Sequence, residues 1–187
     1  MSPTPTPKPI PPRPGRGARA ARMAEILRVD HAGELAAVQI YRGQRAVMGD
    51  GALGRRFAEM QAQEAVHLAR FDALLTERRV RPTAFAPLWR LAGFALGAGT
   101  ALLGEKAAHA CTEAVETVIE EHYADQIAEL RDRDPDLAAE LSGFRDEELA
   151  HRDHAIEDGA REAPGHALLA AVIGAGCRMA IRLSEKI

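Results

Sequence analysis

The segments Glu64-Ala65-Val66-His67 and Glu148-Leu149-Ala150-His151 are two copies of one motif, a glutamate followed three residues later by a histidine. On a helix, residues i and i+3 lie on one face, so each segment can direct a carboxylate and an imidazole at the same point. A lone glutamate precedes each copy: Glu34 lies thirty residues before Glu64, and Glu116 lies thirty-two residues before Glu148. This spacing predicts two helical hairpins, each of which returns the chain to the height at which it started.

Four carboxylates and two imidazoles that converge inside a four-helix bundle are the ligand set of a di-iron or di-manganese centre. Without metal such a cluster would be costly, because taking unpaired carboxylates out of water carries a large free-energy penalty. Carboxylate oxygens with one imidazole per metal suit iron or manganese better than zinc, and iron is the natural choice for chemistry with O2. We therefore predict two iron ions per chain, held by Glu34, Glu64, His67, Glu116, Glu148 and His151.

The fourth glutamate is the one position at which the residues leave a choice. Glu113 and Glu120 lie close to Glu116, but Glu116 is flanked by Val115 and Val118, which favours it as the inward-facing carboxylate. Glu113 and Glu120 are more typical of surface charges. The second ring nitrogens of the two histidines should also have partners, and the candidates are Gln63, Asp146, Glu147 and Asp153.

Other polar residues near the motifs support weaker predictions. Tyr123 lies seven residues after Glu116, on nearly the same helical face, where it could gate a proton or an electron or could simply pack in the core. His31 and His154 each lie one turn from a predicted ligand and are expected to be neighbours or surface residues rather than ligands.

The composition favours helices throughout. Aromatic residues make up only 4% of the chain, while Ala, Leu, Glu and Arg are abundant, and no alternating strand pattern of useful length occurs. We predict an all-α fold in which a four-helix bundle carries the metal centre and an additional apolar helical layer lies beside it. The expected helices are at 23–48, 53–78, 104–133, 137–160 and 166–184.

Residues 86–104 form an apolar segment in which Arg90 is the only charged residue. As an ideal helix the segment would be roughly 28 Å long, close to the hydrocarbon thickness of a bilayer. However, a span here would put the two halves of the metal centre on opposite sides of the membrane, and Gly93 and Gly97 weaken helix continuity. We interpret the segment as one that lies in a membrane interface. The alternatives are internal packing or an oligomer contact, and a true membrane span. The apolar final helix, 166–184, could pair with it.

The beginning of the chain has a different composition. Seven of the first fourteen residues are proline, and no acidic residue precedes Glu25. We predict a disordered Pro/Arg-rich tail at 1–22, or one in weak contact with an anionic membrane, followed by one domain at 23–187. The net charge of −3 gives no reason to expect nucleic acid. Cys111 and Cys177 fit free thiols in a reducing cytoplasm.

Six further segments form a more specific signature: Arg28–Glu34 (RVDHAGE), Arg79–Thr83 (RVRPT), Pro87–Trp89 (PLW), Gly93–Gly104 (GFALGAGTALLG), Phe144–Leu149 (FRDEEL) and Gly176–Arg178 (GCR). Together they resemble the demethoxyubiquinone hydroxylase family of ubiquinone biosynthesis, and the likeness covers about residues 25–187. The ligand pattern alone is shared by many ferritin-like proteins, so these segments narrow the choice.

The resemblance implies a ferritin-like bundle bound peripherally to the membrane, and we expect it at the cytoplasmic face of the cell membrane. It implies a di-iron monooxygenase that uses O2 to hydroxylate the ring of a polyprenyl demethoxyubiquinol-type precursor. It assigns iron ligands to the same six positions and so favours Glu116. It also makes His122, Tyr123 and Arg178 candidates for handling substrate or electrons. A polyprenyl quinol is too apolar to dissolve in water, which agrees with the apolar segment and final helix.

Two other functions would use some of the same features. A ferritin-like iron-oxidising or peroxide-detoxifying protein would share the ligands but would need no apolar membrane surface. A metal-free membrane scaffold would have no use for four convergent glutamates. Electrons could come from NAD(P)H directly or through a reductase, and a homo-oligomer or an accessory lipid-binding protein could take part.

Overall fold

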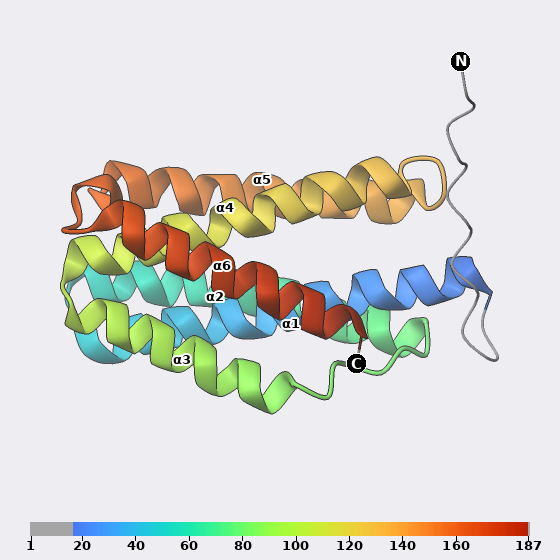
Figure 1. Cartoon of the computed structure of the whole chain (residues 1–187), viewed down its shortest axis with the longest axis horizontal. Helices are drawn as coiled ribbons and strands as arrows, with labels where there is room; N and C mark the ends of the chain where they lie inside the picture. Colours follow the sequence, from blue (N-terminus) through green and yellow to red (C-terminus); the bar gives the residue numbers. More distant parts are fainter. Residues whose placement is uncertain (1–16, 187) are drawn as a thin grey trace, which may run out of the picture.

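The computed structural model describes residues 17–186, and this part of the chain consists of six α-helices and one short 3-10 helix, with no strand (Figure 1). The prediction of an all-α fold is confirmed. The elements are α1 Ala18–Met48, α2 Ala52–Glu77, α3 Ala86–Leu102, α4 Glu105–Leu130, α5 Pro135–Glu157, the 3-10 helix η1 Ala160–Glu162, and α6 His166–Lys186.

Helix α1 begins at Ala18, five residues before the predicted start at Met23. The side chain of Arg22 explains the extension, because its Nε donates to Oε2 of Glu129 in α4 at 3.0 Å and holds this turn against the bundle. Residues 18–22 of the predicted tail therefore belong to α1, and its residues 1–16 lie outside the described residues. For those residues, disorder stays a prediction.

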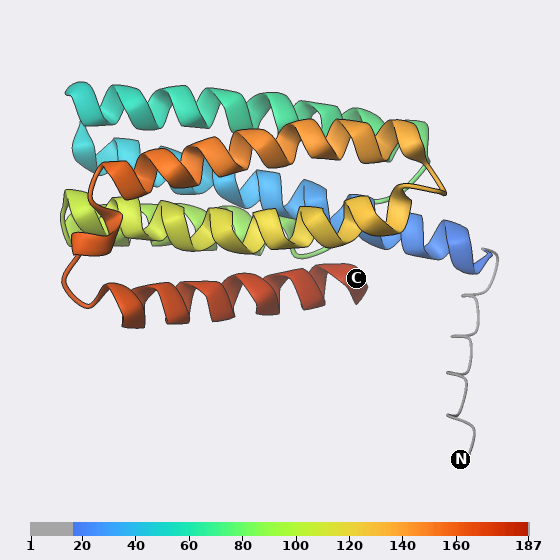
Figure 2. The same ribbon diagram turned by 90° about the horizontal axis from the view of Figure 1, so that it is seen from above.

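Two helical hairpins, α1–α2 and α4–α5, form the four-helix bundle that the motif spacing predicts. Figure 2 shows that α2 and α5 lie on one side of the molecule, α1 and α4 in the middle, and α6 on the opposite side. Buried side chains from all four bundle helices meet in the core, among them Leu27, Phe71, Leu130 and Leu141. The hairpins are thus packed on each other through an apolar core that continues along the bundle from the motif residues.

Helix α3 packs on α1 with almost no space between the two backbones. A Cβ atom at Gly97 would lie 2.0 Å from the backbone oxygen of Ile40, and a Cβ atom at Gly43 would lie 2.3 Å from the backbone oxygen of Phe94. Glycine at these positions permits an approach that no other residue allows. The glycines that were expected to weaken the helix therefore lie in a continuous helix, Ala86–Leu102, and serve its contact with α1.

Helices α3 and α6 form the additional apolar layer beside the bundle. They are linked by Trp89, whose Nε1 donates to Oγ of Ser184 at 3.0 Å. Between this layer and the bundle lies a largely apolar cavity of about 350 Å³, lined by residues of α1, α3, α4 and α6. The layer carries large exposed apolar side chains, of which Val172 and Met179 also line the cavity: Leu88, Leu91, Leu102, Leu103, Leu168, Val172 and Met179.

Among the described residues, α6 is the one helix that is long and apolar enough to cross a membrane by length and composition. In this structure α6 lies along the bundle and does not leave it. Ile173 of α6 is buried against Ile40 and Val115, so one face of the helix belongs to the core. The opposite face is the exposed apolar surface described above.

We expect Gly97→Ala to destabilise the protein by about 1–3 kcal/mol, because the new methyl group would force α3 away from the backbone of α1. Gly99→Ala is the matched control on the same helix, where a Cβ atom meets nothing within 4 Å. That substitution should be neutral or stabilise by up to about 1 kcal/mol, through helix propensity. Urea unfolding measures both values, and equal effects would contradict the close packing.

Candidate metal centre

The structure brings the six predicted ligand residues together in the middle of the bundle. All six residues are buried, and none is more than 4% exposed. They fall into two overlapping groups whose candidate ligand atoms all lie within 4.8 Å of one another. The groups are Glu34, Glu64, His67 and Glu148, and Glu64, Glu116, Glu148 and His151.

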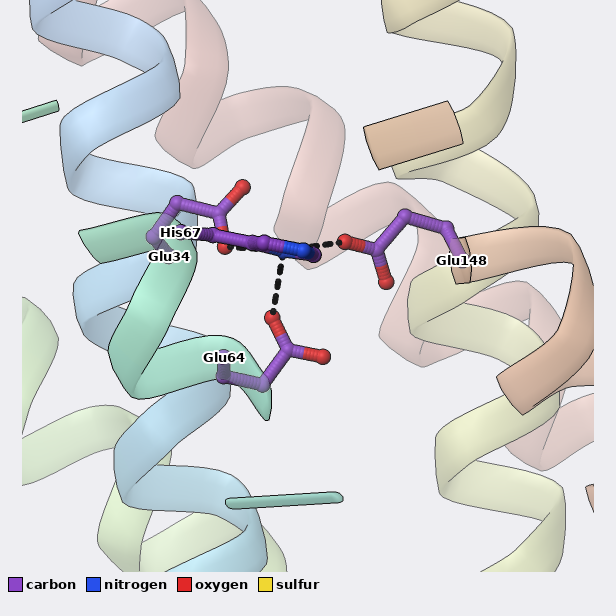
Figure 3. A group of neighbouring side chains, drawn as sticks. All are labelled: Glu34, Glu64, His67 and Glu148. Carbon is purple, nitrogen blue, oxygen red and sulfur yellow. Dashed lines mark ion pairs between the residues drawn. The ribbon is translucent and has the colours of Figure 1, made fainter. Parts of the chain in front are cut away.

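The first group surrounds Nδ1 of His67 (Figure 3). This nitrogen lies 3.4 Å from Oε2 of Glu34, 3.7 Å from Oε2 of Glu64 and 3.3 Å from Oε1 of Glu148. In the second group, Nδ1 of His151 lies 3.0 Å from Oε1 of Glu64 and 3.5 Å from Oε2 of Glu148. Glu64 and Glu148 belong to both groups, so their carboxylates would be available to a metal held by either group.

The donor set fits a pair of divalent cations. Buried polar atoms normally have a hydrogen-bond partner, and leaving them without one is costly. Each of the six residues nevertheless has at least one buried oxygen or nitrogen atom with no hydrogen-bond partner among the described residues, and in both histidines this atom is Nδ1. These atoms point at one another, so a buried cluster of Glu and His side chains is available to hold metal.

The electrostatics of the cluster are those of a site that needs cations. Burial acts to lower the pKa of both histidines. The carboxylates of Glu148, Glu34 and Glu64 nevertheless raise the pKa of His67 well above its usual range. Those of Glu148 and Glu64 raise the pKa of His151 to about 10. Burial, followed by repulsion from Glu148 and Glu64, raises the pKa of Glu116. Without metal, protons must take the place of the missing positive charge.

The second ring nitrogens have partners on the opposite hairpin. Nε2 of His67 lies 2.9 Å from Oε2 of Glu147, and Nε2 of His151 lies 2.7 Å from Oε1 of Gln63. Of the four candidates named from sequence, these two make the contact. Asp153 instead pairs with its neighbour Arg152. Each Nε2–H can donate to its partner oxygen, which leaves Nδ1 free for a metal.

Two tyrosines complete the surroundings of the centre. The hydroxyl group of Tyr123 donates to Oε1 of Glu34, and the hydroxyl group of Tyr41 donates to Oε1 of Glu116 at 2.6 Å. Burial, together with the adjacent glutamates, raises the pKa of both phenols, so they stay protonated donors. Sequence reasoning missed Tyr41. The signal was present, because Tyr41 follows Glu34 by seven residues, as Tyr123 follows Glu116.

Several residues discussed from sequence lie outside the cluster. His31 is buried and contacts Asp72 at 3.1 Å, as expected for a neighbour that is not a ligand. Glu113 pairs with Arg161 and His166, and Glu120 pairs with Arg145, so both belong to ion pairs away from the centre. His122 contacts Gln126, and Arg178 is exposed on α6. Among the described residues, neither makes a hydrogen bond or ion pair with the six ligand residues.

Comparison with known proteins assigns residues 21–184 to the family described as "Ubiquinone biosynthesis protein COQ7". A Rhodospirillum rubrum protein named 3-demethoxyubiquinol 3-hydroxylase is 53% identical over 93% of this chain and 82% of its own length. A human protein named NADPH-dependent 3-demethoxyubiquinone 3-hydroxylase, mitochondrial, is 50% identical over 89% of this chain and 79% of its own length. The Saccharomyces cerevisiae 5-demethoxyubiquinone hydroxylase, mitochondrial, is 38% identical over 91% and 80%.

In the metal-free protein we expect the free energy of unfolding to fall as the pH rises from about 4.3, the ordinary value for glutamate, through neutrality. The folded-state pKa values of Glu116 and His151 lie above their unfolded values, so the native state binds more protons than the unfolded state. Stability is therefore present at low pH and lost as the pH rises towards the folded-state values.

Glu116→Gln should make this dependence shallower, because glutamine keeps the shape and the acceptor for Tyr41 but cannot ionise. Urea unfolding with a chelator between about pH 5 and pH 8 measures the slope. Glu121→Gln, at an exposed position on the same helix, is the control and should leave the slope unchanged. Equal slopes in wild type and Glu116→Gln would show that the buried carboxylate does not control stability.

Proposed function

The chain belongs to the family of the ubiquinone biosynthesis protein COQ7, and from this we propose that it uses O2 and two iron ions to hydroxylate the ring of a polyprenyl demethoxyubiquinol-type precursor. The family makes the chain a hydroxylase of ubiquinone biosynthesis, and thus an oxidoreductase. The observation that carries the finer proposal is the set of buried ligand atoms without partners, next to an apolar cavity. The relatives reported above are all named hydroxylases, so the iron-oxidising or detoxifying alternative has no support from them.

We propose that Glu34 and His67 would hold one iron ion and Glu116 and His151 the other, with Glu64 and Glu148 available to both. The iron pair supplies the activation of O2. One oxygen atom replaces a ring hydrogen with a hydroxyl group, and the other leaves as water after taking two electrons and two protons from the donor. The protein holds the ligands in register through the hydroxyl groups of Tyr41 and Tyr123.

The cavity under α3 and α6 is the proposed substrate site. Gly33 and Val115 line it, and each is the sequence neighbour of a predicted ligand, Glu34 and Glu116. The cavity therefore reaches α1 and α4, the helices that carry Glu34 and Glu116, from the side opposite α2 and α5. Its apolar walls exclude water and suit a prenylated ring, which would lie between the membrane-facing layer and the centre.

We propose that the exposed apolar faces of α3 and α6 lie in the membrane interface at the cytoplasmic face of the cell membrane. This position gives an insoluble quinol a route into the cavity without passage through water. Both cysteines are free thiols, which supports a reducing compartment. Since α6 shares its buried face with the bundle, the association proposed is peripheral.

Electron transfer and substrate orientation are the proposed roles of the remaining candidates. Tyr123 contacts the ligand Glu34, and His122, whose side chain is 21% exposed, lies next to it in sequence. We propose that electrons from NAD(P)H, supplied directly or through a reductase, pass this way. Arg178 lies between two residues that line the cavity, Cys177 and Met179, and is proposed to contact the polar end of the substrate.

We expect Glu148→Ala to lose iron and to lower ring hydroxylation by more than about 100-fold, because it removes a ligand available to both ions and changes to groups around a metal already cost 10–100-fold. Iron per chain after anaerobic loading, and hydroxylated quinol by mass spectrometry, are the measurements. Asp146→Ala removes an exposed carboxylate from the same helix and should retain both. Full activity in Glu148→Ala with intact helicity would refute the proposed centre.

We expect the double substitution Leu91→Glu and Leu168→Glu to weaken binding to lipid vesicles by a factor of about 100 or more, since each buried leucine contributes at least about 1.5 kcal/mol. The two side chains are 68% and 72% exposed on α3 and α6. Val66→Glu is the control, because Val66 is 67% exposed on α2, on the other side of the molecule. Vesicle sedimentation measures binding, and an equal loss in both proteins would contradict the proposed orientation.

A further inference from the structure

Each hairpin contributes the same kinds of residue, in the same order, to the metal centre. Hydrogen bonds between the hairpins connect the two sets. Glu34 and Glu116 are the outer glutamates, since each belongs to only one of the two ligand groups. The tyrosine of each hairpin donates to the outer glutamate of the other hairpin. The residue before each motif glutamate contacts the histidine of the other hairpin. The corresponding residues are Glu34 and Glu116, Tyr41 and Tyr123, Gln63 and Glu147, Glu64 and Glu148, and His67 and His151.

One pair breaks this symmetry. His67 faces a carboxylate, Glu147, whereas His151 faces a neutral amide, Gln63. Both partners are exposed side chains on the same side of the bundle, so solvent affects them similarly. The nearby cation Arg70, one turn after His67, is already neutralised, because its guanidinium group donates twice to Glu140. The partners of the two imidazoles are therefore a difference in charge between the two halves that no neighbouring cation of α2 cancels.

An imidazole that donates its Nε2–H to a carboxylate is a stronger electron donor at Nδ1 than one that donates to an amide. The carboxylate also adds negative charge close to the metal. We infer that the two metal positions are inequivalent: the position of Glu34 and His67 binds a divalent cation more tightly than the position of Glu116 and His151, and fills first. This inference rests on the proposed metal centre and assigns Glu147 and Gln63 as positioning residues that set the order.

Each position can be tested separately in a protein that retains only the glutamate belonging to that position, Glu34 for the His67 position and Glu116 for the His151 position. Glu116→Gln leaves the His67 position complete, and Glu34→Gln leaves the His151 position complete. In both variants glutamine keeps an acceptor for the facing tyrosine. The probe is Mn(II) alone, added anaerobically to the full chain, with free Mn(II) counted by its EPR signal. We expect the Glu116→Gln protein to bind Mn(II) at least about tenfold more tightly than the Glu34→Gln protein.

Substituting the hydrogen-bond partners of the two imidazoles shows whether they cause the difference in affinity. Glu147→Gln should weaken Mn(II) binding about 10–100-fold in the Glu116→Gln background, and by less than about twofold in the Glu34→Gln background. Gln63→Glu should tighten binding only in the Glu34→Gln background. Asp146→Asn removes the same charge from the residue next to Glu147, at an exposed position, and should change neither value. A merely structural role of Glu147 would not produce an effect confined to one position.

The possible results separate this inference from the proposed function. If wild type binds no Mn(II) while its helicity is intact, the metal centre itself is wrong. If wild type binds two ions but the two single-position proteins have equal affinities, or Glu147→Gln weakens both alike, the inequivalence is wrong. Should either single-position protein fail to fold, calorimetric titration of wild type and Glu147→Gln with Mn(II) decides. Wild type should show two binding steps of different affinity, and in the variant the two affinities should become more similar. Unchanged affinities would overturn the inference.

Discussion

Four carboxylates held in the dry interior of a helical bundle are the constraint on which this structure depends. Their mutual repulsion and loss of hydration oppose folding, and the raised pKa of Glu116 expresses that cost. The raised pKa values of His67 and His151 show that protonated imidazoles offset part of it. The surrounding bundle has to be rigid enough to hold them together, which is why apolar packing between the hairpins lies beyond the site. Function and stability therefore act against each other at the same atoms, as is common where chemistry requires buried charge.

The molecule is also divided by polarity along one direction. On the side of α2 and α5, the hairpins are joined by polar pairs such as Arg70 with Glu140 and His67 with Glu147. On the side of α1 and α4, the cavity and the layer of α3 and α6 are apolar. The centre lies between a polar face, where its imidazoles meet Glu147 and Gln63, and an apolar face, which is the proposed route of the quinol. In the proposed function, one fold thus separates control of the metals from access of the substrate.

Much of this was predictable because helical periodicity is a local property. The two Glu-x-x-His motifs and the flanking Val115 and Val118 were enough to select Glu116 and to predict two hairpins. Features that depend on how the hairpins meet were not predictable. The sequence could not choose Glu147 over Asp146 as the partner of His67, because that choice depends on the rotation of α5 against α2. The role of Gly97 was misjudged, since its helix-weakening tendency is local whereas its benefit is a contact with Ile40 on another helix.

The crossed tyrosine contacts have a consequence for the order of folding events. Tyr41 and Glu116 are 75 residues apart in the chain, and Tyr123 and Glu34 are 89 residues apart. Each hairpin is closed by local contacts and can form early, but contacts of such long range wait until the two hairpins dock. The centre is therefore assembled by the last large step of folding rather than by either half, and a nascent chain that has not yet added α5 presents no complete group of ligands to iron.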